Sequence, residues 1–226
     1  MNNWIINKTS SEEGKYAEYL VEHVSKKLGK SYDDRSDDTD YQKIDVDANI
    51  DDVLTEVKND TWIHKTGNAV YEISTHASKE DERMFYAWKD RQSEPLRFRD
   101  IPPYGSIGCN EKCEADEFFY VSTIEDREGS KQYRLNFNDP AYIIDNKKFK
   151  AYVRNTMLKK WQVRIVPHEE DKAFNIILLI KINDLIKAGV AKRIDSEMLS
   201  VLEENRKIFS TPMTSEELGR KLKIIE

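Results

Sequence analysis

The chain has 226 residues, enough for one substantial domain or a core with a small appendage. Charged residues make up 35% of it, the mean hydropathy is −0.75, and no apolar run could span a bilayer, so we expect a soluble globular protein without a membrane partner. A formal net charge of −6 excludes coating of nucleic acid through bulk positive charge, but it allows a local basic patch. No secretion signal is visible at the start, which predicts a cytoplasmic location.

In chain order, the first element is a helix over residues 11–30, where apolar residues recur at helical spacing and Gly29 supplies a stop signal. A polar stretch over 31–40 predicts a loop, and the Pro- and Gly-containing stretch over 89–117 predicts irregular structure. Alternating or continuously apolar runs predict strands over 42–50, 53–59, 68–75, 117–123, 132–144 and 175–182. Helical patterns cover 146–160, 184–191, 195–209 and 215–222.

A helix followed by clustered strands and then by mixed elements predicts an α/β chain with helices that flank a central mixed β-sheet. We expect a core over residues 1–182. The helical segments over 183–226 then form a C-terminal extension that serves core packing, a dimer contact or a DNA contact.

Two neighbouring runs, 44–50 and 53–58, each alternate with period two and flank a turn at Asp51 and Asp52. If they form a hairpin, Ile50 faces Val53, Ala48 faces Thr55 and Val46 faces Val57 on one apolar face.

The opposite face of this predicted hairpin pairs Asp47 with Glu56, and Asp45 with Lys58. Directly opposed side chains on one sheet face have Cβ atoms roughly 4.5–5.5 Å apart, where two ionised carboxylates repel. A divalent cation with a preference for oxygen ligands, such as Mg²⁺ or Mn²⁺, would turn this repulsion into attraction. The alternative is a solvated polar face without chemistry, which the alternation alone leaves open.

Asp47, followed on the next strand by Glu56-Val57-Lys58, resembles the Asp…(Asp/Glu)-X-Lys signature of PD-(D/E)XK nucleases, which include Holliday junction resolvases. Phage-type members of that family have similar segments in the same order, which here are 42–47, 56–60, Thr66-Gly67-Asn68 and Glu72. Further similarity lies in Gly14 and Glu18 of the first helix and in the runs 118–121 and 142–145, so the resemblance covers residues 11–155. No proline precedes Asp47, which departs from the family name.

The resemblance implies a restriction-endonuclease-like fold and hydrolysis of DNA phosphodiester bonds with Mg²⁺ or Mn²⁺. Asp47, Glu56 and the backbone carbonyl of Val57 would hold the ion, which acidifies water and neutralises charge on the phosphate, and Glu18 could reach it through water. Lys58 would orient or deprotonate the attacking water and stabilise the transition state. Asp45 stays open as an alternative to Asp47.

The densest basic segment lies between residues 147 and 164, and on a helix such side chains could contact phosphates. A solvated basic helix face is the alternative. The candidate nucleic-acid-binding residues are Lys147, Lys148, Lys150, Arg154, Lys159 and Lys160.

A DNA nuclease that cuts both strands needs two active sites, so we expect a homodimer. Two other functions share the same residues. One is a nucleic-acid-binding or interaction module without productive catalysis, and the other is a ribonuclease on the same scaffold.

Overall fold

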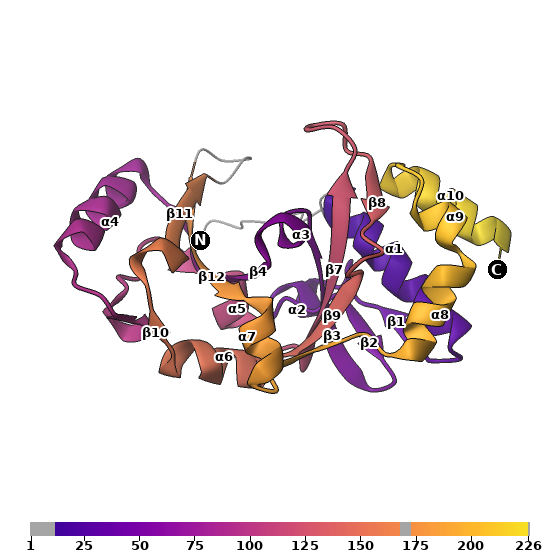
Figure 1. Cartoon of the computed structure of the whole chain (residues 1–226), viewed down its shortest axis with the longest axis horizontal. Helices are drawn as coiled ribbons and strands as arrows, with labels where there is room; N and C mark the ends of the chain where they lie inside the picture. Colours follow the sequence, from indigo (N-terminus) through magenta and orange to yellow (C-terminus); the bar gives the residue numbers. More distant parts are fainter. Residues whose placement is uncertain (1–11, 168–172, 226) are drawn as a thin grey trace. The chain divides into compact units, whose positions relative to one another are not determined.

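The computed structural model describes residues 12–167 and 173–225, and the chain divides into two compact units (Figure 1). Within the described residues, unit 1 comprises 12–64, 115–143 and 193–225, and unit 2 comprises 65–114, 144–167 and 173–192. The chain thus alternates between the units. This division differs from the expected organisation, a core over 1–182 followed by an extension over 183–226.

Unit 1 is built on a mixed sheet whose strands lie in the order β1-β2-β3-β7-β9-β13, with β8 also paired to β7. The β1, β2 and β3 strands are antiparallel, whereas β3 and β7 run parallel. The α/β class with a mixed central sheet flanked by helices is therefore as predicted. The strands are Tyr32–Asp34 (β1), Ala48–Ile50 (β2), Val53–Asp60 (β3), Glu117–Glu125 (β7), Tyr133–Leu135 (β8), Ala141–Asp145 (β9) and Ala191–Arg193 (β13).

The first helix, α1 (Glu12–Lys27), forms as predicted and buries an apolar stripe that includes Tyr16, Leu20 and Val24. It ends at Gly29, whose φ of 70° is the left-handed conformation that closes a helix. The stripe packs in one core with β3, β7 and the C-terminal helices, which lie alongside α1 (Figure 1). These helices are α8 (Ser196–Glu204), α9 (Arg206–Phe209) and α10 (Ser215–Ile225).

Because Leu202, Phe209 and Leu218 are nearly inaccessible in the same core as α1, the C-terminal helices complete unit 1. Burying side chains of this size contributes roughly 1.5–3 kcal/mol each. Core packing, one of the three roles considered for residues 183–226, is the role that the structure shows for these helices.

Two expectations near the predicted hairpin were wrong. The expected loop over 31–40 contains β1, an edge strand whose paired backbone needs no apolar side chains. The expected strand over 42–50 shortens to β2, because α2 (Thr39–Gln42), with Asp38 as its N-cap, and the turn that follows it, in which Asp45 has a φ of 50°, occupy the start of the segment.

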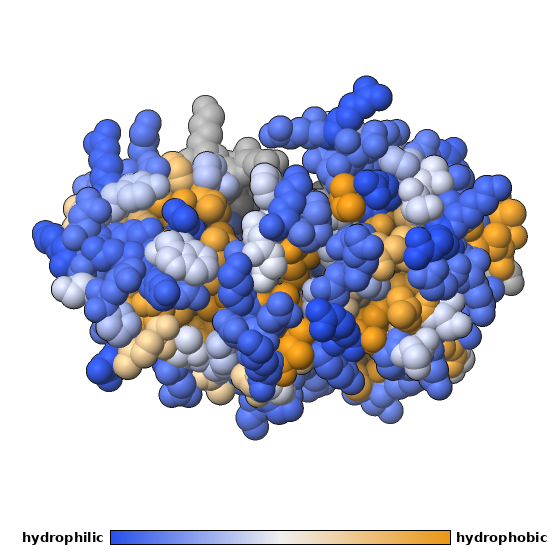
Figure 2. Space-filling view, viewed as in Figure 1, coloured by the Kyte–Doolittle hydropathy of each residue, from blue (hydrophilic) through white to orange (hydrophobic). Residues whose placement is uncertain are grey.

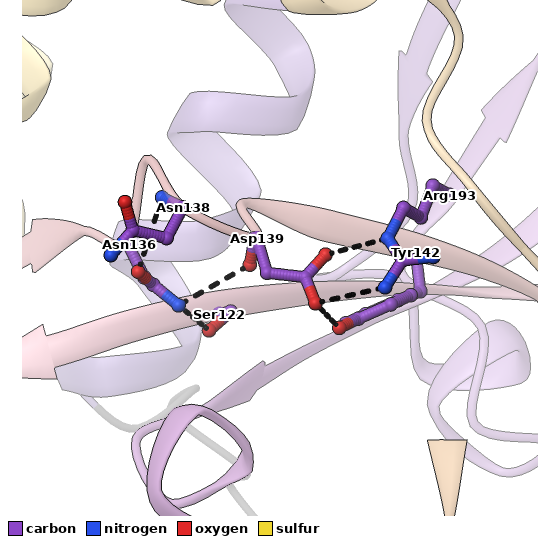
Figure 3. A network of polar contacts seen from close by, with 6 residues as sticks. All are labelled: Ser122, Asn136, Asn138, Asp139, Tyr142 and Arg193. Carbon is purple, nitrogen blue, oxygen red and sulfur yellow. Dashed lines mark hydrogen bonds and ion pairs between the residues drawn. The ribbon is translucent and has the colours of Figure 1, made fainter. Parts of the chain in front are cut away.

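A polar network holds β13 beside the loop that precedes β9 (Figure 3). The Arg193 guanidinium donates to both carboxylate oxygens of Asp139, at 3.1 and 3.4 Å, and the Tyr142 hydroxyl donates to the same carboxylate. Asn136 Nδ2 donates to Ser122 Oγ at 3.2 Å and thereby ties this loop to β7. Together these contacts hold the segment that leads into the C-terminal helices against the sheet.

Unit 2 is an antiparallel sheet in the order β11-β12-β4-β6, with a two-stranded ribbon of β5 and β10. The strands predicted over 68–75 and 175–182 are confirmed as β4 (Asn68–Ala77) and β12 (Phe174–Lys181). The other strands are β5 (Leu96–Arg97), β6 (Ser106–Ile107), β10 (Met157–Leu158) and β11 (Val163–Pro167). The helices are α4 (Lys79–Arg91), α5 (Cys109–Lys112), α6 (Asn146–Asn155) and α7 (Ile182–Lys187), with short 3₁₀ turns at Phe98–Asp100 and Lys160–Gln162.

The predicted helix over 146–160 ends at Asn155, and the stretch over 89–117 is more ordered than predicted. Hydrophilic side chains cover most of the visible face in Figure 2, as the high charged fraction requires. No helix in the described part of the chain is long and apolar enough to cross a membrane.

Candidate active site on the β2–β3 hairpin

The β2–β3 hairpin has the predicted register. Ile50 pairs with Val53 and Ala48 pairs with Thr55, and the turn residues Asp51 and Asp52 both have positive φ, as a tight two-residue hairpin turn requires. Ala48 and Thr55 are fully buried. The apolar face is therefore the core face, and Glu56 and Lys58 project from the other face of β3.

Asp47 lies immediately before β2, where the regular ladder ends. Its N–H donates to the carbonyl of Thr55 at 3.0 Å, and its side-chain Oδ2 accepts a hydrogen bond from the N–H of Val57 at 2.8 Å. The predicted direct pairing of Asp47 with Glu56 is thus replaced by a contact of the Asp47 carboxylate with the β3 backbone. The carboxylate is nonetheless held at the position along β3 that the hairpin predicted.

Glu56 is 4% exposed, although it carries a carboxylate. The Lys58 ammonium donates to its Oε1, as expected for side chains two residues apart on one face of a strand. Burial raises the pKa of Glu56 to about 8; the Lys58 charge opposes this shift, and the neighbouring Asp47 and Asp45 carboxylates reinforce it. Glu56 therefore lies at the centre of a group of like charges.

Glu18, on α1, belongs to the same group of charges. Burial raises its pKa to about 8, and the nearby Asp47 and Asp34 carboxylates add to the shift, while Lys15 opposes it. Glu18 and Asp47 are thus close enough for their charges to interact. We call Glu18, Asp47, Glu56 and Lys58 the hairpin cluster.

Asp34 is an acid near this cluster that the sequence did not indicate. It lies on β1, inside a stretch expected to be a loop, and its Oδ1 accepts hydrogen bonds from the backbone and hydroxyl of Ser36. The only signal available in the sequence was the density of acids over 33–40. Strand pairing with β2 brings one of them beside the site.

Asp45 lies outside the β2–β3 ladder, so the strand register that was predicted to set it opposite Lys58 does not extend to it. It lies in the turn between α2 and β2 with a φ of 50°, and a continuous strand would be needed for that pairing. It is 3% exposed, and its charge contributes to the raised pKa of Glu56. Asp45 thus lies near the cluster, but in a turn and not on the strand where it was expected.

No group of three or more His, Cys, Asp and Glu side chains in the described part of the chain is arranged as a metal site. The hairpin cluster does not have this arrangement, because two of its carboxylate oxygens have other partners. Asp47 Oδ2 accepts a hydrogen bond from the Val57 amide, and Glu56 Oε1 accepts one from Lys58. A cation would have to compete with Lys58 for Glu56. Val57 itself is buried on β3 opposite Phe119 of β7.

The six basic candidates all lie in unit 2. Lys148 pairs with Asp145 at 2.9 Å, Arg154 with Glu111 at 2.8 Å, and Lys150 donates to the carbonyl of Cys113 at 2.7 Å. Lys159 and Lys160 lie outside α6, contrary to the predicted helix, and Lys160 Nζ donates to the carbonyl of Asp90 at 3.3 Å.

Lys147 and Lys159 are exposed, and among residues 12–167 and 173–225 their ammonium groups make no hydrogen bond or ion pair. If this surface binds nucleic acid, replacing both with alanine should weaken binding and reduce the salt dependence, by about 0.7–0.9 in the slope of log K against log salt for each lost phosphate contact. Fluorescence anisotropy at several salt concentrations measures this. Lys187→Ala, an exposed lysine on α7, is the control, and an unchanged slope in the double variant would remove this surface from consideration.

The site is therefore a group of buried or half-buried carboxylates against one lysine. Comparison with protein-family models, curated proteins and solved structures finds no match. The chemistry of the hairpin cluster has to be argued from its own residues.

Proposed function

We propose that the chain is a metal-dependent nuclease of the PD-(D/E)XK type that hydrolyses phosphodiester bonds in DNA. The observation that carries the proposal is Glu56. A carboxylate that is 4% exposed, with a raised pKa and other acids around it, destabilises the fold, and groups of this kind concentrate at functional sites. The order of a helix with an acid, an antiparallel hairpin and a parallel strand supports a restriction-endonuclease-like core.

The donor chemistry of the hairpin cluster fits a divalent cation. The Asp47 carboxylate repels both Glu18 and Glu56, which are poorly solvated, and hard oxygen donors suit Mg²⁺ or Mn²⁺. Asp47, Glu56, the carbonyl of Val57 and, through water, Glu18 would hold the ion. When bound, it would neutralise charge on the phosphate and favour deprotonation of water.

The side chains of Asp47 and Lys58 have separate roles in the proposed reaction. The Asp47 carboxylate is oriented by the Val57 amide, so it does not have to be ordered when substrate arrives. Lys58, 29% exposed at its side chain, is positioned by Glu56 and can reach towards solvent. From there its ammonium would orient the attacking water and stabilise negative charge on the phosphate in the transition state.

The test of the metal site is Asp47→Asn, which keeps an oxygen that can accept the Val57 N–H but removes the charge. We expect Mn²⁺ to raise the melting temperature of the parent chain, since a ligand that binds only the folded state stabilises it by about 2.7 kcal/mol at one hundred times its Kd. The rise should be absent in Asp47→Asn. Asp40→Asn, an exposed acid paired with Lys43, is the matched control. A melting temperature equally sensitive to Mn²⁺ in Asp47→Asn would place the metal elsewhere.

The hydrogen bonds that occupy Asp47 Oδ2 and Glu56 Oε1 favour one other function, a nucleic-acid-binding or interaction module without catalysis. Incubation with labelled linear, branched and single-stranded DNA, and with RNA, in Mn²⁺ separates the alternatives. Cleavage of DNA supports the proposal, cleavage of RNA alone makes the chain a ribonuclease, and binding without cleavage favours the module. A homodimer with two sites would account for cutting of both strands.

A further inference from the structure

A tryptophan projects into solvent just beyond the hairpin cluster. Trp62 lies two residues beyond the end of β3 and is 63% exposed, more than any other aromatic side chain in the described part of the chain. Exposure of so large a ring forgoes the stabilisation that its burial would bring. Such a residue suggests a binding role when its backbone is held in place.

The backbone at Trp62 is fixed. Asp60, itself 8% exposed, accepts hydrogen bonds through Oδ1 from the N–H of Trp62 at 2.7 Å and of Ile63 at 2.8 Å. The Ile63 side chain is buried and anchors the next position. The side chain of Asn59 ties the end of β3 to α1 and β7, because its Nδ2 donates to the carbonyl of Glu13 and its Oδ1 accepts from Thr123 Oγ1. The indole is thus presented from a rigid support.

The position of Trp62 relative to Lys58 is limited by the chain. They are four positions apart in the chain, so their Cα atoms are at most about 15 Å apart. Stacked nucleotides in one strand are spaced by about 3.4 Å. A base that contacts Trp62 therefore belongs to a nucleotide only a few positions from the phosphate at Lys58.

We propose that Trp62 is a stacking platform for an unpaired base of the substrate strand, next to the scissile phosphate. This inference rests on the proposed nuclease function and names its substrate class as DNA with single-stranded or unpaired nucleotides at the cleavage site. An indole face stacks on any base that is not already stacked in a duplex, which makes the contact independent of sequence. Trp62 lies between the polar Thr61 and the buried Ile63, so the indole is the exposed apolar group of this short segment.

The experiment measures binding in a Lys58→Ala background with Mn²⁺, in which cleavage is slow compared with the measurement. It uses a labelled single-stranded oligonucleotide and a blunt duplex of the same sequence. Trp62→Ala should raise the Kd for the single strand about 5- to 100-fold, the range observed when one stacking contact is removed. The Kd for the duplex should not change. Trp62→Phe should recover most of the loss, and Tyr86→Ala, an exposed aromatic residue on α4 outside both candidate surfaces, is the control.

Unchanged single-strand binding in Trp62→Ala, or equal weakening for both DNAs, overturns the stacking inference. The proposed function is tested separately, by cleavage with the chain that carries Lys58. If this chain cleaves DNA and Trp62→Ala binds and cuts single strands equally well, only the stacking inference fails. If it neither binds nor cleaves any DNA, both fail. A melting temperature of Trp62→Ala equal to that of the parent confirms that the variant is folded.

Discussion

Replacing Lys58 with alanine is expected to reduce metal-dependent DNA cleavage by about 10²–10⁴-fold, the contribution typical of one group that assists proton transfer. The variant should still bind metal and DNA. An ammonium that acts on the attacking water or on the charge of the transition state contributes to the rate and little to ground-state affinity. Single-turnover cleavage at saturating DNA measures the chemical step directly.

The structure also predicts that the effect of Lys58→Ala on metal affinity depends on pH. Lys58 counteracts the raised pKa of Glu56, so its loss should raise that pKa further and shift metal binding to higher pH. Metal affinity of Lys58→Ala should therefore be compared with the parent above pH 8 as well as at neutral pH. If the metal affinities of Lys58→Ala and the parent differ at pH 7 and become equal at higher pH, the ammonium acts on metal binding through the pKa of Glu56.

Lys43→Ala is the matched control for Lys58→Ala, because Lys43 also pairs with an acid of unit 1 but is exposed. It should cut DNA at the parental rate. Cleavage by Lys58→Ala at the parental rate would remove the hairpin from the active site and favour the interaction module.

Glu56→Gln is expected to stabilise the metal-free protein at alkaline pH. The pKa of Glu56 is about 8 in the folded chain, against 4.5 for an ordinary glutamate. Between these values the folded chain keeps a proton that the unfolded chain releases, so the free energy of unfolding falls as the pH rises through this window. Glutamine resembles the protonated acid and does not ionise, so the variant avoids this loss.

Between pH 5 and pH 9 the free energy of unfolding of the parent should fall further than that of Glu56→Gln. The difference between the two losses should be at least about 1.4 kcal/mol, the equivalent of one pKa unit. Urea unfolding without metal at several pH values measures it. Glu18, whose pKa is also about 8, should leave a residual slope that the double variant with Glu18→Gln removes.

Mn²⁺ at pH 8.5 should restore the stability of the parent but not of Glu56→Gln, because only the parent has the charged ligand. Glu203→Gln serves as the control, since its exposed pairing with Arg206 lowers the pKa of Glu203 and keeps its titration below this window. If the free energy of unfolding depends on pH in the same way in the parent and in Glu56→Gln, Glu56 ionises normally. Its burial would then no longer support a functional site.

The sequence by itself determined the elements that have a strong local pattern. These include α1 with its stop at Gly29, the strands β3, β4 and β12, and the register of the β2–β3 hairpin. Period-two alternation on both sides of Asp51 and Asp52 specifies which residues face each other, because a slip of one residue would turn the apolar face to solvent.

Only the tertiary structure decided what surrounds the hairpin acids. The alternation placed Glu56 on the polar face, where solvation was the simplest expectation, but the folded chain buries its side chain near the Asp47 and Asp45 carboxylates. The contact of Asp47 with the Val57 amide arises where α2 interrupts the predicted strand. Burial, charge interactions and the packing of the C-terminal helices on α1 depend on residues far apart in the chain, and local periodicity carries no information about such distant neighbours.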